Sequence, residues 1–262
     1  MAKTIVITNR KGGVGKSAAV ANLGIGLAGN GKKTLIIDTD NQHSLTVSMG
    51  IAEPDKLPIT LANIISDIII GKEIDPEAGI IHHCEGVDIM PANNTLTGIE
   101  LALASILVGR ETILRQYIEK VKPLYDYILL DCAPTIDLLT VNSLTAADCA
   151  IIPVTPKYLD ARGLELLLKS IAQIRQNLNP NLTIGGILFT MVDNRTILSK
   201  EIIRAIEEAY GEKIRIFNSR IPHSIRAAET SATGKSIFSH DPTGRVAAAY
   251  SDFTREVLSD VA

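Results

Sequence analysis

A glycine-rich loop near the amino terminus limits the possible folds of this chain more than any other feature. The loop Asn9–Ser17, with the sequence NRKGGVGKS, stands between the apolar run Thr4–Thr8 and a segment of helical period that begins at Lys16. Glycines let such a loop curl until several backbone N–H groups point at one phosphate, and the start of the helix adds partial positive charge. The segment therefore predicts a strand–loop–helix unit that binds phosphate.

The side chains of the loop suit a nucleoside triphosphate. Lys16 would reach the β- and γ-phosphates, and Ser17 would offer its hydroxyl to Mg²⁺. The loop backbone would surround the phosphate oxygens. We expect the nucleotide to contact Lys11, Gly12, Gly13, Val14, Gly15, Lys16, Ser17 and Ala18.

Short apolar runs alternate with longer segments of helical period along the rest of the chain. Helices are predicted from Lys16 to about Ala28 and from Asp160 to Leu178, where Leu and Ile side chains form one apolar stripe. Because strands joined by crossover helices run parallel and are covered on both faces, the pattern predicts an α/β fold: a doubly wound, mostly parallel sheet with helices on both faces. No linker or internal repeat interrupts residues 1–262, which we expect to form a single domain. The further strand candidates are Thr34–Asp38, Val87–Met90, Tyr127–Asp131, Ala150–Val154 and Ile184–Thr190.

The composition argues against several classes of protein. Aromatic residues make up only 4% of the chain and Trp is absent, which disfavours stacking platforms for single-stranded nucleic acid and the aromatic belts of membrane proteins. No apolar run approaches the roughly 18 residues of a membrane span, and the first residues show no signal-peptide pattern. The three cysteines, Cys84, Cys132 and Cys149, form no C-x-x-C pair. We therefore expect a cytoplasmic protein.

Carboxylates follow two of the predicted strands, at the place where ligands of open α/β sheets gather. The first strand of this kind leads into Asp38-Thr39-Asp40-Asn41-Gln42, and the second ends in Asp131. Carboxylates there can hold a water near the γ-phosphate or bind the waters of Mg²⁺. The loop and the two carboxylate ends occur in an order that disfavours kinases and dehydrogenases, which need G-x-G-x-x-G after the first strand.

The same three segments resemble the motifs of a known superfamily. They are similar to the deviant Walker A motif K-G-G-x-G-K-[ST], the D-x-D-P-Q motif and the Walker B strand of the P-loop ATPases that include ParA, Soj and MinD. The resemblance implies ATP and Mg²⁺ as cofactors, with Ser17, Asp38 and Asp131 at the metal. It also implies that the catalytic residues are Lys11, Lys16 and Asp40. In such proteins the residue matched by Lys11 reaches across an ATP-bound homodimer to the partner's nucleotide, and the residue matched by Asp40 orients water.

Two later segments resemble the ParA and Soj branch of this superfamily. Asp193–Thr196 is similar to its D-x-R-T, and Ile221–Glu229 is similar to its I-P-R-N-V-R-L-x-E-A. The resemblance implies that Pro222 belongs to the nucleotide site. It also implies that nonspecific double-stranded DNA is bound by Arg195, Arg226, Lys235 and Arg220. The net charge of the chain is −3, but residues 195–245 hold nine Lys and Arg against six Asp and Glu, which suits phosphate contact. The chain departs from the family pattern at Ala18, Asn41, His223, Ser231 and Ser236.

The function that the resemblance implies is ATP-dependent segregation of DNA. Mg-ATP would drive formation of a homodimer, the dimer would bind duplex DNA at the nucleoid, and a ParB-like centromere-binding partner would stimulate slow hydrolysis and release. The alternative is a positioning ATPase of the MinD type that cycles on a membrane, or a relative that positions another cargo. Residues 251–262 carry one Arg against three Asp and Glu, which disfavours contact with anionic lipid, so no membrane is expected. No convincing cysteine pair suggests an iron–sulfur cluster, and Mg²⁺ is the one metal we predict.

Overall fold

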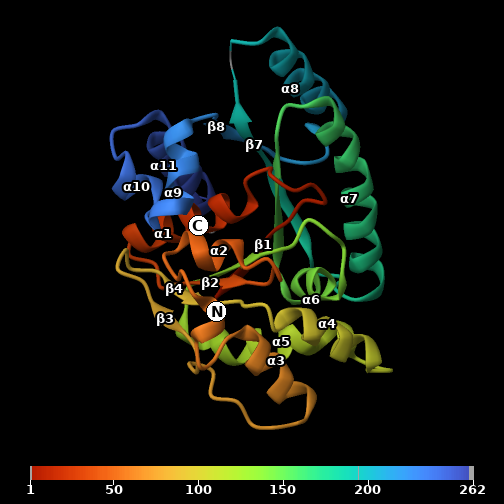
Figure 1. The fold of residues 1–262 in the computed structure, drawn as a ribbon. Helices are drawn as coiled ribbons and strands as arrows, with labels where there is room; N and C mark the ends of the chain where they lie inside the picture. Colours follow the sequence, from red (N-terminus) through yellow and green to blue (C-terminus); the bar gives the residue numbers. More distant parts are fainter. Residues whose placement is uncertain (1, 194, 260–262) are drawn as a thin grey trace.

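The computed structural model describes residues 2–193 and 195–259. Within them, eight strands form one sheet that has helices on both sides (Figure 1). The strands are β1 (Lys3–Ile7), β2 (Thr34–Asp38), β3 (Ile81–His82), β4 (Asp88–Met90), β5 (Tyr127–Asp131), β6 (Cys149–Val154), β7 (Thr183–Val192) and β8 (Ile216–Pro222). The α-helices are α1 (Lys16–Gly29), α2 (Ser44–Ser48), α3 (Leu61–Ile69), α4 (Leu96–Ser105), α5 (Ile113–Val121), α6 (Leu138–Ala146), α7 (Tyr158–Asn177), α8 (Ile197–Tyr210), α9 (Ile225–Thr233), α10 (Ile237–His240) and α11 (Arg245–Ser259). Short 3₁₀ turns are η1 (Pro54–Lys56), η2 (Arg110–Thr112) and η3 (Lys122–Leu124).

The sheet has the strand order β3-β4-β2-β5-β1-β6-β7-β8. All neighbouring strands in it run parallel except β3 and β4, so the expected mostly parallel, doubly wound α/β fold is confirmed. β1 lies between β5 and β6, and both Ile7 of β1 and Asp38 of β2 stand opposite Asp131 of β5. The carboxyl ends of these three strands therefore meet at one edge, where the predicted site residues are concentrated.

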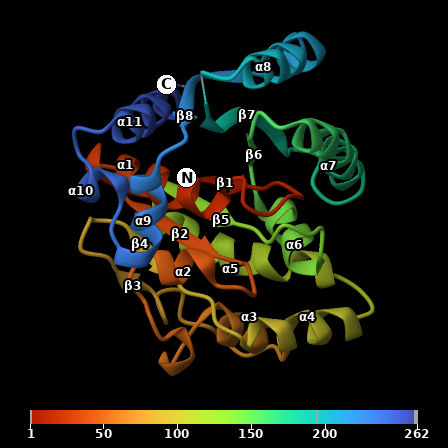
Figure 2. The same cartoon turned by 45° about the horizontal axis from the view of Figure 1, so that its top comes forward.

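The alternation of side chains along β1 separates the two layers of the core. Ile5 and Ile7 pack with α1, α2, α10 and α11, whereas Val6 faces the side that α3 to α8 cover (Figure 2). Since a strand points successive side chains to opposite faces, a sheet that is buried on both sides needs apolar residues at consecutive positions. This requirement explains the continuous apolar runs of β1, β2 and β5, which are buried along nearly their whole length.

The edge strand β8 was absent from the strands expected from sequence. Its burial alternates from residue to residue, because one of its faces is turned to solvent and the other packs under α11. A search for continuous apolar runs does not detect such a strand. The apolar side chains of α11, among them Tyr250 and Phe253, are buried against the sheet and α1. Among the helices described here, none is long and apolar enough to cross a membrane.

Candidate nucleotide-binding site

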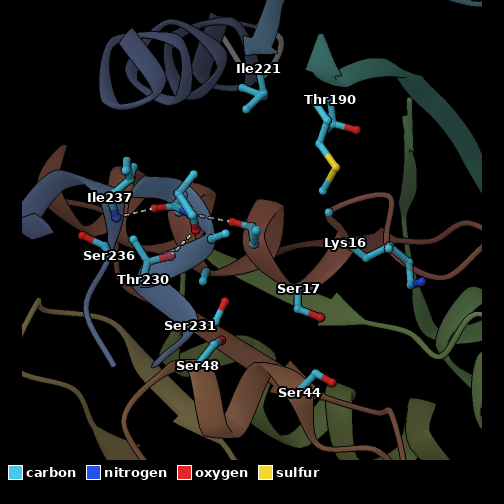
Figure 3. Close-up of a pocket in the computed structure, with 18 of the residues that line it drawn as sticks. Lys16, Ser17, Ser44, Ser48, Thr190, Ile221, Thr230, Ser231, Ser236 and Ile237 are labelled. Atoms are coloured by element: carbon cyan, nitrogen blue, oxygen red, sulfur yellow. Dashed lines mark hydrogen bonds between the residues drawn. The ribbon is translucent and has the colours of Figure 1, made fainter. Parts of the chain in front are cut away.

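A cavity of about 800 Å³ opens beside the glycine-rich loop at the carboxyl edge of the sheet. Figure 3 shows Lys16 and Ser17 at one end of it and the side chains around Ser236 at the other. The loop and the first turns of α1 form the first end. The second end is formed by α9 and by the segment that joins α9 to α10. The cavity is therefore longer than a phosphate group, and it extends along α1 toward the carboxyl-terminal helices.

The loop is fixed from both sides by side-chain hydrogen bonds. Asn9 Nδ2 donates to the carbonyl oxygen of Pro153 at 2.7 Å, and Asn9 Oδ1 accepts from Lys11 N at 3.0 Å. On the other side, Thr190 Oγ1 donates to the carbonyl oxygen of Val14 at 2.8 Å. Gly15 has φ 84°, a left-handed conformation that a residue with a Cβ rarely adopts, so this position requires glycine. The loop is thus held in shape by its neighbours in β6 and β7.

Lys16 places a cation inside the site. Only 7% of the residue is exposed, and its Nζ donates to the carbonyl oxygen of Lys11 at 3.3 Å. Burial lowers the pKa of Lys16, and the charges of Asp131 and Asp40 partly oppose that shift. Because a buried ammonium lacks the hydration it has in water, an anionic ligand beside it gains more than it would on the surface.

Asp131 is a buried carboxylate whose hydrogen-bonding capacity is unused. Both of its carboxylate oxygens are shielded from solvent, and neither has a partner at full hydrogen-bond geometry among the described residues, although the Ser17 hydroxyl is near enough to act on its pKa. Burial raises the pKa of Asp131 well above its ordinary value, and the neighbouring Asp38 adds to the shift, while Ser17 and Lys16 act against it. A buried acceptor left without a partner is costly and is typical of a site that completes its interactions with a ligand or ion.

The second acidic segment is organised around Asp38. Its Oδ2 accepts from Thr46 N at 2.8 Å and Thr46 Oγ1 at 2.7 Å, and its Oδ1 accepts from Asp40 N at 3.1 Å. Burial raises the pKa of Asp38 to about 6, although these hydrogen bonds oppose the shift. Asp40 lines the cavity, and its Oδ1 accepts from Gln42 N at 2.9 Å. Asp38 therefore shapes the loop that presents Asp40.

The donor set fits a nucleotide with Mg²⁺. The hydroxyl of Ser17 and the carboxylate of Asp131 are hard oxygen ligands of the kind Mg²⁺ prefers. No group of three or more His, Cys, Asp or Glu side chains suited to a metal occurs in residues 2–193 and 195–259. That finding is compatible with Mg²⁺, which usually keeps several waters and relies on ligand phosphates for the remaining contacts.

Most of the predicted nucleotide contacts line the cavity. Val14, Asp38 and Asp131 are buried beside it, and Lys11 contributes its carbonyl oxygen to Lys16. Lys235, expected on a DNA surface, is exposed and also lines the cavity at its far end. The predicted residues in the lining are Gly12, Gly13, Gly15, Lys16, Ser17, Ala18, Asp40 and Pro222.

The three predicted DNA-binding arginines all form ion pairs within the chain. Arg195 pairs with Asp193 through two N–O distances of 3.0 Å, and this contact lowers the pKa of Asp193 to about 2. Residue 194 in the same motif lies outside the described residues. The side chains of Arg220 and Arg226 pair with the carboxylates of Glu207 and Asp241 at 2.6 and 2.8 Å.

Three residues that shape the cavity were not predicted from sequence, namely Asn22, Thr190 and Ser236. Asn22 is a buried amide in a helix that is otherwise apolar along this stretch, a pattern that marks a polar contact in the core. Thr190 and Ser236 reach the site from β7 and from the start of α10. No local pattern marks them, because their role depends on the distant segments that they touch.

Comparison with known proteins identifies the relatives of the chain. Residues 2–184 match the AAA domain family. The chain is 36% identical over 260 residues to the sporulation initiation inhibitor protein Soj of Bacillus subtilis, and the match covers 99% of this chain and 100% of Soj. The chain belongs to the Soj and ParA family. The chromosome partitioning protein ParA of Caulobacter vibrioides is 32% identical over 259 residues, covering 98% of this chain and 94% of ParA.

A solved structure with bound ligands has the same fold. A Mycobacterium smegmatis protein described as cobyrinic acid a,c-diamide synthase, with bound ADP and magnesium, matches with a TM-score of 0.78 and 31% identity. The match covers 94% of this chain and 98% of that chain. The ligands of this neighbour are an adenine nucleotide and magnesium. These are the two kinds of cofactor that the sequence of our chain predicts.

Proposed function

We propose that this protein is an ATP-dependent DNA partition ATPase. In the proposed cycle, Mg-ATP binds in the cavity and stabilises a homodimer, the dimer binds duplex DNA without sequence preference, and a ParB-like partner stimulates hydrolysis and release. Residues 1–262 would act as one ATPase domain in the cytoplasm, associated with the nucleoid. One observation carries the proposal: buried Lys16 and the unpartnered carboxylate of Asp131 lie at the glycine-rich loop of a chain that matches Soj over nearly its whole length.

Each side chain of the site has a defined part in the proposed hydrolysis. Lys16 and the loop N–H groups hold the phosphates, and the N-terminus of α1 favours their negative charge. Mg²⁺, when bound through Ser17 and Asp131, supplies electrostatic stabilisation of the charge on the phosphate oxygens. Asp40, presented at the cavity by the hydrogen bonds of Asp38, would position the attacking water. Lys11 would contact the nucleotide of the second protomer.

The arginine pairs affect how DNA would bind. An exposed ion pair contributes little stability, so a DNA phosphate can displace the carboxylate from Arg195 or Arg226 at small cost. The side chains of these arginines are 90% and 65% exposed, which leaves them accessible. Each protomer offers few such contacts, and the dimer doubles them on one rigid body, so binding would depend on ATP.

A DNA-binding assay with charge variants tests this function. Wild type with Mg-ATP should bind two duplexes of unrelated sequence equally, and the affinity should fall steeply with salt. The double variant Arg195→Ala/Arg226→Ala should lose binding at moderate salt while ATP still drives dimerisation. The matched variants Asp193→Asn and Asp241→Asn release the same arginines and should bind a few times more tightly. Full binding by the double variant would refute the assignment of these arginines.

The MinD-type alternative has a distinct test. Tyr250 and Phe253 of α11 are buried in the core, so the described part of the last helix has its apolar face inside the fold. Sedimentation with anionic liposomes should therefore leave the protein in the supernatant with ATP as well as with ADP. Co-sedimentation that depends on ATP, together with no DNA binding, would replace the partition proposal by a membrane-cycling one.

A further inference from the structure

The far end of the cavity is closed by a segment with little structure of its own. Residues 234–236 connect α9 to α10, and α10 has only four residues. Gly234 is left-handed, with φ 65°, and packs directly on the backbone of Gly50. A helix of four residues does not form by itself in water, because the nucleation cost exceeds the gain of its single turn. The position of this segment therefore depends on contacts from other parts of the chain.

Two such contacts come from opposite sides. Asn22 Oδ1, in α1, accepts a hydrogen bond from Ile237 N at 3.0 Å, and Asn22 Nδ2 donates to the carbonyl oxygen of Ala18 at 2.8 Å. On the outer side, Glu85 reaches from the turn between β3 and β4. Its Oε1 accepts from Ser236 N at 2.9 Å, and its Oε2 accepts from the hydroxyls of Ser236 and, at 2.8 Å, Ser239.

The Glu85 carboxylate is built to stay charged and fixed. Burial raises its pKa, but the hydrogen bonds from Ser236 and Ser239 lower it by more, so the net shift is downward. The turn that carries Glu85 is itself closed by a hydrogen bond from His83 N to the carbonyl oxygen of Val87 at 2.9 Å. Hydrogen bonds to an ionised acceptor are roughly twice as strong as neutral ones. Glu85 is thus a strong anchor for a weakly structured segment.

The anchored segment faces the part of a ligand that lies beyond its phosphates. Phosphate binds at the start of α1, at Lys16, whereas Asn22 lies six residues further along, about 9 Å at 1.5 Å per residue. Asn22, Ser236 and Ile237 line the cavity at this distance, and the dashed line that ends at Ile237 in Figure 3 marks the hydrogen bond that joins α1 to this wall. A nucleoside attached to those phosphates would extend toward this wall.

We propose that Glu85 is a positioning residue of the nucleotide site, holding residues 235–237 against α1 so that the wall for the nucleoside end exists before the ligand arrives. The inference rests on the proposed nucleotide binding in this cavity. Glu85 touches no phosphate and does not line the cavity; it acts through Ser236. A wall formed in advance spares the ligand the cost of ordering it, which is a gain in affinity for the base-bearing part alone.

The chain offers a matched control in Glu256. Its carboxylate accepts from Asn218 N at 2.9 Å, from Ser219 N at 2.7 Å and from the Ser219 hydroxyl, so it anchors β8 as Glu85 anchors α10. The pKa of Glu256 is also lowered, with burial opposed by these hydrogen bonds. Neither Glu256 nor its partners Asn218, Ser219 and Arg215, the last an ion pair at 3.5 Å, line the nucleotide cavity. Glu256→Gln therefore reports the general cost of weakening such an anchor.

The test compares a ligand that has a nucleoside with one that has none. Binding of ADP and of pyrophosphate, each with Mg²⁺, is measured on the full chain by calorimetry, together with thermal unfolding. Glu85→Ala should weaken ADP about tenfold and change pyrophosphate less than about twofold. Glu85→Gln, which retains one acceptor oxygen, should lie between wild type and Glu85→Ala. Glu256→Gln should lower the melting temperature while leaving the ratio of the two affinities unchanged.

A double-mutant cycle tests the route through Ser236. If Glu85 acts by holding Ser236, then adding Ser236→Ala to Glu85→Ala should cost little further ADP affinity. Equal losses for ADP and pyrophosphate, or unchanged ADP affinity in a folded Glu85→Ala protein, would overturn the inference. If Glu85→Ala does not fold, the affinities for ADP and pyrophosphate are compared in Glu85→Gln and Ser239→Ala instead, and a larger loss for ADP supports the inference while equal losses overturn it. Wild type that binds neither ligand would instead overturn the proposed nucleotide site itself.

Discussion

The unpartnered carboxylate of Asp131 leads to a prediction that separates stability from ligand binding. Asp131→Asn keeps the shape of the side chain and removes a negative charge that is fully buried and has no partner at full hydrogen-bond geometry among the described residues. A buried charge without a partner costs several kcal/mol, whereas the neutral amide of the variant, also without a partner, costs about 1–3 kcal/mol. The ligand-free variant should therefore be more stable than wild type by about 2 kcal/mol at pH 8. For a chain of this size that is a rise of about 4–8 °C in melting temperature.

The pH dependence of this difference follows from the raised pKa of Asp131. The cost of the charge is full above the pKa in the folded state and declines as the pH falls below it, because folding must then take up a proton; it vanishes only below the ordinary pKa of aspartate, where the group is neutral in both states. The advantage of Asp131→Asn should accordingly shrink as the pH is lowered. Asp148→Asn is the control, since half-exposed Asp148 accepts a hydrogen bond from Thr4 N at 2.8 Å and should gain nothing from neutralisation.

Ligand binding should show the opposite effect in the same assay. Mg-ADP at about 100 times its dissociation constant stabilises wild type by about 2.7 kcal/mol, and part of that gain requires the metal. In wild type, EDTA should remove the share of the ADP stabilisation that depends on magnesium. Asp131→Asn should lack this share even when magnesium is present. Thermal unfolding of both proteins with no ligand, with ADP and EDTA, and with Mg-ADP measures all these quantities. A ligand-free variant that melts below wild type at pH 8, or that retains the full magnesium-dependent shift, would refute the reasoning.

Three further predictions concern other parts of the molecule. Asp40→Ala should bind ATP and dimerise yet release phosphate many times more slowly, because it removes a water-positioning group; turnover equal to wild type in a phosphate-release assay would contradict this role. Lys16→Ala should lose nucleotide binding, whereas Lys11→Ala should bind ATP and remain monomeric, and light scattering that shows an ATP-induced dimer of the latter would exclude a cross-dimer contact. Gly234→Ala should lower the free energy of unfolding by about 3 kcal/mol in urea titrations, because its Cβ would lie 2.5 Å from a backbone Cα and its φ is 65°. Gly71→Ala, equally left-handed but with nothing within 4 Å, should cost only about 1 kcal/mol.

The phosphate end of the site could be predicted because its parts are continuous in sequence. Residues 9–17 carry the loop, the buried lysine and the hydroxyl that we propose as a ligand of Mg²⁺ together, and β1 and α1 on either side are regular enough to be recognised from their patterns. The same holds for β2 and β5, whose observed bounds coincide with the predicted ones and whose last residues are Asp38 and Asp131. Where functional side chains lie in the same short segment as a recognisable strand or helix, both the side chains and the element can be predicted from the sequence.

The nucleoside end could not be predicted in this way because it is assembled from distant segments. Ser236 meets Glu85, which is 151 positions away, and Ile237 meets Asn22, which is 215 positions away. Neither pairing has a local signature, since each residue alone has the appearance of an ordinary polar residue. The glycine pair in β7 is a similar case. The need for glycine there arises from the packing of the sheet, because a Cβ on Gly185 would lie 2.3 Å from Cys149 Sγ on the neighbouring strand.

The arginines show a different limit of reasoning from the sequence. Asp193 stands two residues before Arg195, so that pair lies within one short motif, but Arg220 and Arg226 find their carboxylates 13 and 15 positions away through the packing of the fold. The count of charges along residues 195–245 already includes Glu207 and Asp241 but omits Asp193, and no count shows that these three arginines are each paired with a carboxylate. Since phosphate must displace a carboxylate at each of these positions, binding through them has to weaken with salt and strengthen when the carboxylate is neutralised. That opposite response to Arg and Asp substitutions distinguishes phosphate contacts from a charged surface that serves only solubility.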